Sequence, residues 1–301
     1  MNKIKIDYIT VNDNIIVHRK TGSEVNEGNI TCVNMKDGLI FIDTGRNANE
    51  TLKFRKDMEA KFSKETKFVI LSHSHNDHYF GIAAFKDVPI IASKIFYEQY
   101  FEQEKQGLLS KEYRQKSVDH IKGEANQGKY TLSEQWHKDW SINFVNAELL
   151  PISFGISDEL VIGDKDQQLI FKTIGGHTAC SGYLHYLPDN ILITGDNFNC
   201  MHARNSGCML AGINWDLLEI LKKFEDMNPT KIIPGHGPVV EKEYITTSRE
   251  YFSSTLTKLK ELKEKGLSEE EAIQSPELPE FFEEEKHERH DFILSNWFKQ
   301  L

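Results

Sequence analysis

The feature that most constrains this sequence is a dense group of histidines and an aspartate directly after a short apolar run. Phe68-Val-Ile-Leu71 is apolar and contains β-branched residues, which predicts a buried strand. His73-Ser-His75-Asn-Asp77-His78 follows it. A loop at the end of a strand can turn these side chains toward one point, and their nitrogen and oxygen atoms suit zinc, and also iron or manganese. Since the chain has 12 histidines in 301 residues, chance explains this cluster poorly, and we predict a metal centre.

Other segments repeat the order of strand, sharp loop and ligand-type residue. Ile174-Gly-Gly-His177 places a histidine after a strand, and Ile191-Leu-Ile-Thr-Gly-Asp196 places a carboxylate after another. Ile232-Ile-Pro-Gly-His236 ends a third, and Phe41-Ile-Asp43 ends an early one. Each alone is weak evidence, because Asp and His often occupy turns at strand ends. Together, in this order, they indicate one site.

The pattern of elements predicts an α/β fold. The first 45 residues form an expected meander of strands over Ile4–Val17, Ile30–Met35 and Gly38–Asp43, and Asn49–Phe62 has helical spacing. A further strand is expected at Val88–Ala92, so strands and helices alternate. Later strands are expected at Glu159–Ile162, Gln168–Ile174, Tyr183–Tyr186, Ile191–Thr194 and Ile232–Ile233, and later helices at Trp215–Met227 and Ser248–Lys265.

Residues 93–150 interrupt this alternation and are interpreted as a helical insertion. The segment is rich in Glu, Gln, Lys and aromatic residues, and Gly107 and Gly128 are expected to separate two or three helices. Its aromatic side chains could line the roof of a substrate pocket, form a small core of their own, or form a homodimer interface. These three roles stay open for Tyr97, Tyr100, Phe101, Trp136 and Trp140.

Length and composition indicate one large domain over residues 1–301, with a helical C-terminal segment at 245–301. Hydrophobic residues make up 39% and the net charge is -10, which argues for a sizeable core and against nucleic acid as a partner. The N-terminus alternates apolar and charged residues, unlike a signal peptide, and no apolar stretch is long enough for a membrane span. We therefore expect a cytoplasmic protein. Its four cysteines form no CxxC pair.

The motif and the later His, Asp and His resemble the metallo-β-lactamase superfamily from about Ile30 to Val240. The resemblance implies an αβ/βα sandwich of two mixed sheets with helices outside, here with the helical insertion, and two divalent metal ions. It implies that three histidines bind the first ion, that Asp77 and two histidines bind the second, and that Asp196 bridges both. It also implies that Asp43 orients a metal-binding histidine. The implied histidine ligands are His73, His75 and His177 for the first ion and His78 and His236 for the second.

The implied activity is hydrolysis. A metal-bound hydroxide would cleave an ester, thioester, lactone or related bond of a small molecule, with Asp77 and Asp43 as the candidate catalytic carboxylates. Asp196 resembles the glyoxalase II-like, lactonase-like and phosphodiesterase or ribonuclease branches, because true β-lactamases of this family lack that bridging aspartate. A phosphodiesterase or nuclease, and a non-enzymatic metal-binding protein, stay as alternatives.

Two departures from the family pattern bear on the substrate. Tyr79-Phe80-Gly81 stands where the family commonly has two small residues, and Thr178-Ala179-Cys180 stands where it commonly has Thr-Pro-Gly. Both are expected to reshape the pocket wall without removing a ligand. Cys180 and Cys200 are expected to be packing residues, since metal-dependent hydrolysis needs no thiol nucleophile.

Overall fold

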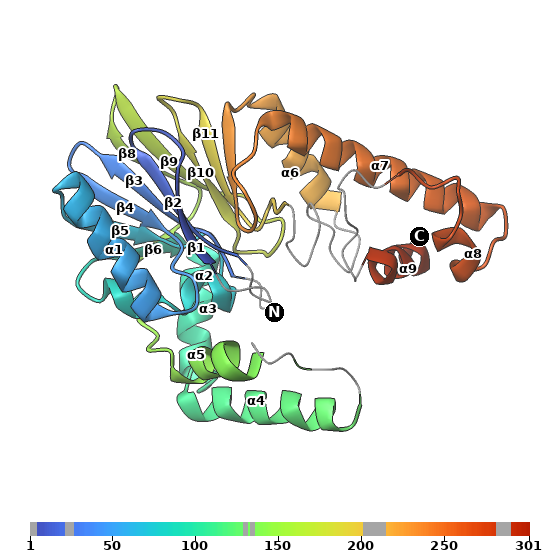
Figure 1. Ribbon diagram of the computed structural model, residues 1–301, viewed down its shortest axis with the longest axis horizontal. Coiled ribbons are helices and arrows are strands. Elements are labelled where there is room, and N and C mark those ends of the chain that lie inside the picture. Colours follow the sequence, from blue (N-terminus) through green and yellow to red (C-terminus); the bar gives the residue numbers. More distant parts are fainter. Residues whose placement is uncertain (1–4, 22–26, 129–131, 133–135, 201–214, 281–289) are drawn as a thin grey trace. The chain divides into compact units, whose positions relative to one another are not determined.

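The chain folds into two compact units, each with strands and helices (Figure 1). The computed structural model describes residues 5–21, 27–128, 132, 136–200, 215–280 and 290–301. The first unit comprises Met1–Ile174 and Thr178–Gly182, and the second comprises Gly175–His177 and Tyr183–Leu301. The strands among the described residues form one sheet of seven and one of five, which confirms the predicted mixed α/β class.

The seven-stranded sheet belongs to the first unit, and its spatial order is the chain order. The first three pairs are antiparallel and the last three are parallel. The predicted meander is therefore confirmed, and it leads into parallel strands whose carboxyl ends share one edge. The strands are β1 Lys5–Thr10, β2 Ile15–Thr21, β3 Ile30–Met35, β4 Gly38–Ile42, β5 Thr66–Ile70, β6 Ile90–Ser93 and β7 Phe154–Ile156.

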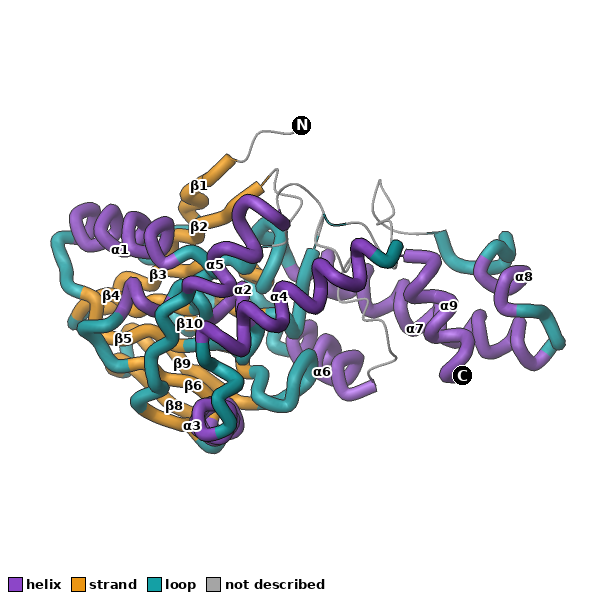
Figure 2. The backbone as a smooth tube through the Cα atoms, turned by 90° about the horizontal axis from the view of Figure 1, so that it is seen from below, coloured by secondary structure: helices purple, strands orange, loops and turns teal. Residues whose placement is uncertain are grey.

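Helix α1 (Ala48–Phe62) connects β4 to its parallel neighbour β5 and lies beside the strands in two perpendicular views (Figures 1 and 2). The Asn47 side chain accepts hydrogen bonds from two amides of the first turn, and Ser63 ends the helix in the left-handed conformation. The helix buries Phe54 and Met58 in the core of the unit. Two very short helices, α2 (Asn76–Tyr79) and η1 (Ile82–Phe85), lie between β5 and β6.

The insertion is helical, as predicted, and its breaks fall at the expected glycines. Ser93 and Ser110 cap α3 (Lys94–Lys105) and α4 (Lys111–Asn126), and Gly107 and Gly128 follow them at φ of 73° and 78°. A π-helical turn, η2 (Trp136–Trp140), then leads into α5 (Ser141–Asn146). Residues 129–131 and 133–135 of the predicted insertion lie outside the described residues.

Several aromatic side chains of the insertion are core residues. Phe96 and Tyr100 are each 3% exposed and belong to the core cluster of the first unit, together with Tyr79. Trp136 belongs to a smaller cluster with Val118 and Val145. Trp136 thus lies in a small core of the insertion, as one of the three open roles predicted, whereas Tyr100 lies in the main core of the first unit, which none of the three roles predicted.

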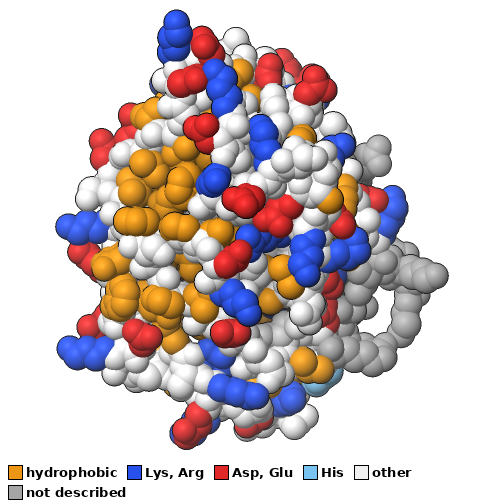
Figure 3. Space-filling view, turned by 90° about the vertical axis from the view of Figure 1, so that its left-hand side faces the viewer, with side chains coloured by type: hydrophobic (Ala, Val, Ile, Leu, Met, Phe, Trp, Pro, Cys, Tyr) orange, Lys and Arg blue, Asp and Glu red, His pale blue; other side chains and the backbone are white. Residues whose placement is uncertain are grey.

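The first unit also contains an antiparallel pair, β8 (Glu159–Asp164) and β9 (Gln167–Thr173). The three-residue strand β7 was not predicted, because three residues show no periodicity. Hydrophobic side chains gather on one face of the molecule (Figure 3). The exposed large hydrophobic residues of α3, β7 and β8 are Ile95, Phe101, Phe154 and Val161.

The second unit contains β10 (Gly182–Tyr186), β11 (Ile191–Gly195) and β12 (Lys231–Pro234), with β11 and β12 parallel. Its helices are α6 (Trp215–Asp226), α7 (Lys242–Glu264), α8 (Glu269–Ile273) and α9 (His290–Gln300). Helix α7 begins at Lys242, six residues before the predicted start at Ser248. The prediction missed these first turns because their residues are mostly polar, apart from buried Ile245, and show no helical pattern. Residues 281–289 of the predicted helical tail lie outside the described residues.

The described residues bear on the predicted absence of a membrane span and on the predicted packing role of two cysteines. None of the helices described is both long enough and apolar enough to cross a membrane. Cys180 and Cys200 are buried and unbridged, as expected of packing residues, and their sulfurs contact Ser74 Oγ at 3.3 Å and the Pro238 carbonyl at 3.1 Å. Cys208 lies outside the described residues.

Candidate metal centre

Asp43 organises the first unit's share of the predicted ligands. It follows β4, and the motif follows the parallel neighbour β5, so the two strands end at the same edge. The Asp43 carboxylate accepts hydrogen bonds from the Ser72 amide and the Ser72 hydroxyl, both at 2.7 Å, and lies 2.8 Å from His78 Nδ1. Asp43 is 3% exposed and has a φ of 59°, a conformation that Asp tolerates better than most residues.

This network determines which nitrogen two of the histidines present. An ionised carboxylate only accepts, so His78 Nδ1 must donate to Asp43, which leaves Nε2 as the unprotonated nitrogen. The single Ser72 hydroxyl proton is donated to Asp43. His73 Nδ1, 3.0 Å from Ser72 Oγ, must therefore donate as well. His73 and His78 both offer Nε2, the tautomer that metal binding through that atom requires.

The imidazoles of the motif lie close together. The His73 ring centroid is 4.7 Å from that of His75 and 4.3 Å from that of His78. His75 is the residue before α2, and Asp77 and His78 lie within that helix. Asp77 Oδ2 is 3.9 Å from His78 Nε2. The first unit thus brings together all four predicted motif ligands and the aspartate predicted to orient them.

Gly28 is a residue of this region that the sequence analysis missed. A Cβ atom placed on it would lie 2.7 Å from the Asp77 carbonyl oxygen and 2.8 Å from the His78 ring. The backbone before β3 can approach the motif this closely only because residue 28 has no side chain. No periodicity or ligand pattern distinguishes this glycine in the sequence, so only the tertiary contact reveals its role.

Asp196 lies close to the other two predicted ligands of the second unit. It follows β11, and His236 follows the parallel neighbour β12, so these two strands also end at one edge. The two carboxylate oxygens of Asp196 are divided between two histidines: Oδ2 lies 3.4 Å from His177 Nε2, and Oδ1 lies 3.3 Å from His236 Nε2. Both distances exceed those of a good hydrogen bond between N and O.

Two asparagines that the sequence analysis missed hold the histidine loops of this unit. Asn197 Oδ1 accepts from the His177 amide at 2.8 Å, and its Nδ2 donates to the Gly175 carbonyl at 2.9 Å. Asn199 Oδ1 accepts from the His236 amide at 2.9 Å. Both are buried and follow Asp196 in the same turn. Their position after a strand-terminal Asp was a signal, but Asn is common in turns for local reasons.

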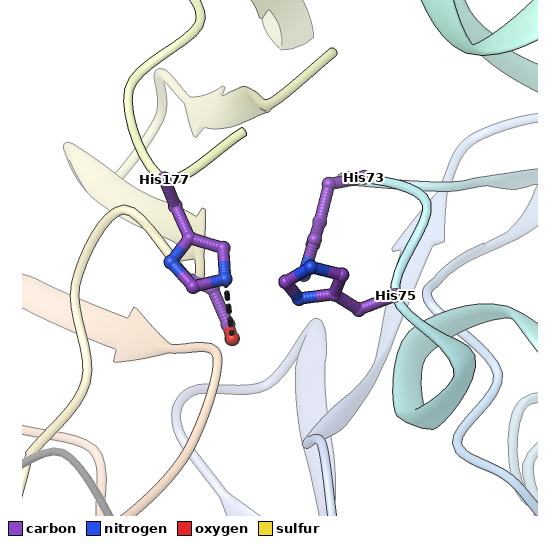
Figure 4. A group of neighbouring side chains, drawn as sticks. His73, His75 and His177 are labelled. Carbon is purple, nitrogen blue, oxygen red and sulfur yellow. Dashed lines mark ion pairs between the residues drawn. The ribbon is translucent and has the colours of Figure 1, made fainter. Parts of the chain in front are cut away.

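The side chains of His73, His75 and His177 are drawn in Figure 4, where the dashed line marks the ion pair between His177 and Asp196. His73 and His75 come from the loop after β5, and His177 comes from the loop that contains Gly175 and Gly176. Among the predicted ligands, the first unit contains His73, His75, Asp77 and His78, and the second contains His177, Asp196 and His236.

The donor chemistry of this centre and the sheet architecture both define a class of protein. A model of the metallo-β-lactamase superfamily matches residues 24–236. The chain belongs to this superfamily and has its αβ/βα sandwich fold, a fold of generally hydrolytic metalloenzymes. The predicted resemblance is thereby confirmed, and the histidines and aspartates described above are candidates for its metal ligands.

Individual relatives are distant. The chain is 23% identical over 240 residues to a "Beta-lactamase-like protein 2 homolog" of Caenorhabditis elegans, and it covers 65% of that protein, just under two thirds of its length. A metallo-beta-lactamase from Pontibacter korlensis matches with a TM-score of 0.57 at 14% identity, over 80% of this chain and 96% of that one. A sec-alkyl sulfatase, PisA1, matches with a TM-score of 0.65 at 17% identity, over 98% of this chain and 50% of that one. These likenesses establish the fold.

Proposed function

We propose that this protein is a hydrolase that binds two divalent metal ions, zinc foremost, and cleaves an ester, thioester, lactone or related bond of a small molecule. In this proposal His73, His75 and His177 hold one ion, Asp77, His78 and His236 hold the other, and Asp196 is shared. Membership of the superfamily and the chemistry of the donors support it.

The observation that carries the proposal is the placement of the two Asp196 oxygens. Ligand atoms about 2.0–2.1 Å from a tetrahedral zinc ion lie about 3.3–3.4 Å from one another. The two N···O distances around Asp196 are 3.4 Å and 3.3 Å, one for each oxygen and each histidine. The Asp196 geometry therefore fits two ions better than it fits direct hydrogen bonds, with one of these histidines and one Asp196 oxygen among the ligands of each ion.

The residues of the chain have defined tasks in such a reaction. Two dications held by these residues would supply a nucleophile near neutral pH and polarise the carbonyl oxygen of the substrate. Asp43 holds the proton of His78 Nδ1 and so keeps Nε2 directed at the ion. Asn197 and Asn199 fix the backbones of the two histidine loops, which limits movement of His177 and His236. Asp77 and Asp196 offset part of the positive charge.

The metal content tests this proposal. Elemental analysis of protein produced with zinc, iron or manganese supplied should give two ions per chain, and Asp196→Ala should lower that number. A stoichiometry of one that Asp196→Ala leaves unchanged contradicts the dinuclear assignment. Screens with lactones, thioesters and bis(p-nitrophenyl) phosphate then separate carboxyl-transfer substrates from a phosphodiesterase.

A matched pair of histidine substitutions tests the site itself. His236→Gln should lower the turnover of the best substrate by at least about 100-fold, which corresponds to about 2.7 kcal/mol of transition-state stabilisation. His185 is a histidine of the same unit on β10, bonded through Nε2 to Asn190 Oδ1 at 2.7 Å. His185→Gln should keep nearly full activity. Equal activities of the two variants would remove His236 from the site.

A further inference from the structure

Arg46 is a buried arginine that contacts the metal-binding motif. It lies between β4 and α1, and its side chain is 5% exposed. Its Nε donates to Asn76 Oδ1 at 2.9 Å, and its Nη2 lies 3.8 Å from Asp77 Oδ2. Its Nη1 donates to Glu27 Oε1 at 2.7 Å. The guanidinium therefore links the residue before Asp77, the Asp77 carboxylate and the segment before β3.

The flat face of the same guanidinium packs on the insertion. Its Cζ atom is 5.7 Å from the ring centroid of Trp140, a cation-π distance. Trp140 is part of a column of stacked rings, with centroid separations of 5.3 Å to Trp136 and 4.9 Å to Phe144. Phe144 in turn stacks on Phe80 at 5.2 Å and 15°. The insertion thus contacts the motif region at Phe80 directly and at Asn76 and Asp77 through Arg46.

The aromatic residues that depart from the family pattern are what the insertion packs against. Tyr79 packs on Phe96 and Tyr100, and its hydroxyl donates to the Leu150 carbonyl at 3.0 Å. Phe80 stacks on Phe144, and the Arg114 Cζ is 5.7 Å from the Phe80 ring centroid. Small residues at 79 and 80 could make none of these contacts.

Arg46 forms a buried ion pair with Glu27, and losing either partner would deprive the other of this opposite charge inside the protein. Burial raises the pKa of the Glu27 carboxyl, and Arg46 and then Lys20 act against that rise. A buried carboxylate left without its cation would be strongly destabilised, so the pair holds both groups in place. Lys20, on β2, also bonds to Asp139 of the insertion at 3.1 Å. Ion pairs and ring stacking therefore fix Arg46 from the sheet side and from the insertion side.

We propose that Arg46 is a positioning residue for Asp77, and that the insertion, through Trp140, holds Arg46 and thereby braces the motif. This inference rests on the proposed dinuclear function, because Asp77 matters as a ligand only there. A fork-shaped guanidinium suits the task, since it can bond two groups in one plane while its face stacks on a ring. A lysine would retain the charge but not this geometry.

Arg55 provides a matched control. It is 7% exposed, against 6% for Arg46, and its Cζ lies 5.4 Å from the Phe85 ring centroid. It also pairs with two carboxylates, with N···O distances of 2.9 Å to Glu59 and 2.8 Å to Asp87. None of these partners belongs to the motif. Arg55→Met should therefore lower stability as Arg46→Met does, without changing metal binding.

The experiment is a titration of metal-free protein with Co²⁺, followed by its visible absorption, with melting temperatures measured alongside. Wild type should bind two ions. Arg46→Met should lower the affinity for one of the two ions by about 10- to 100-fold, the usual effect of removing a group that orients a metal ligand. Arg46→Lys, which retains the charge, should fold and show a smaller loss in the same direction. Trp140→Leu should also weaken the same ion, and Arg55→Met should weaken neither.

The outcomes separate this inference from the proposed function. If wild type binds fewer than two ions, the dinuclear function is wrong and the inference falls with it. If wild type binds two, and Arg46→Met and Arg46→Lys bind both with unchanged affinity, the function stands and only the positioning role is overturned. If only Trp140→Leu bound both Co²⁺ ions with unchanged affinity, the role of the insertion in holding Arg46 would be wrong, and Arg46 would remain the positioning residue.

Discussion

His18 is a buried imidazole whose surroundings disfavour its protonated form. It is 4% exposed and packs against the rings of Tyr8 and Phe54, at centroid separations of 5.8 Å and 5.3 Å. Burial, followed by the positive charges of Lys20 and Lys53, lowers the pKa of His18 to about 4. The folded protein therefore holds His18 neutral over a pH range in which an unfolded chain would protonate it.

The lowered pKa of His18 makes the protein less stable toward unfolding as the pH falls. Well above pH 6.5 neither state binds the proton, and His18 adds no pH dependence. As the pH falls from 6.5 toward 4, the unfolded state takes up a proton and stability falls, by up to about 3 kcal/mol. His18→Leu should remove this part of the acid sensitivity. Urea unfolding of both proteins at pH 7.5, 6, 5 and 4.5 measures it, and parallel stability curves for the two would refute the assignment.

At the scale of elements, the two units position their candidate ligands by the same strand arrangement. β4 and β5 are parallel neighbours that end at Asp43 and the motif, and β11 and β12 are parallel neighbours that end at Asp196 and His236. Parallel pairing brings carboxyl ends to one edge. After these strand ends, the Asp43 carboxylate and the Asn199 side chain accept hydrogen bonds from the Ser72 and His236 backbone amides.

Gly235 lies at the tightly packed edge where β11 and β12 end. A Cβ atom there would lie 2.1 Å from Asp196 Oδ1 and 2.7 Å from the Gly195 carbonyl carbon, so the carboxylate or the backbone must move. Gly235→Ala should therefore weaken metal binding and lower the unfolding free energy by about 1–3 kcal/mol. Metal titration and urea unfolding measure the two effects.

Gly123 is the matched control for that substitution. It lies within α4, and a Cβ atom there would meet nothing within 4 Å. Gly123→Ala should raise the unfolding free energy by about 0.5–1 kcal/mol, because alanine loses less conformational entropy in a helix, and should leave metal binding unchanged. If Gly235→Ala behaved like Gly123→Ala, the close approach to Asp196 would be wrong.

At the scale of the whole molecule, the insertion is a structural part of the first unit. Tyr100 is 3% exposed, whereas Tyr113 on α4 is 45% exposed. Tyr100→Ala should cost about 3–5 kcal/mol of unfolding free energy, as for a large aromatic removed from a core, and Tyr113→Ala should change it by less than about 0.5 kcal/mol. Thermal unfolding distinguishes them. A Tyr100→Ala variant with an unchanged melting temperature but altered KM would instead place this ring in a substrate pocket.

The sequence by itself determined the fold class, the order of most strands and helices, and the candidate donors of the proposed metal centre. Strand and helix periods depend on residues close together in the chain, and the motif His73–His78 is likewise local. The helix breaks at Gly107 and Gly128 were predictable for the same reason, since glycine sets the backbone conformation of its own residue.

Only the tertiary structure decided how the donors are held. The bonds from Asp43 to Ser72 and His78, from Asn199 to the His236 loop, and from Arg46 to Asn76 join residues 29 to 37 positions apart. No local pattern encodes such pairs, because each depends on which strand ends become neighbours in a sheet. The aromatic stack between the insertion and Phe80 also depends on tertiary contacts. It explains why a large residue stands at position 80, because the stabilisation that a side chain provides depends on the neighbours that it packs against in the folded protein.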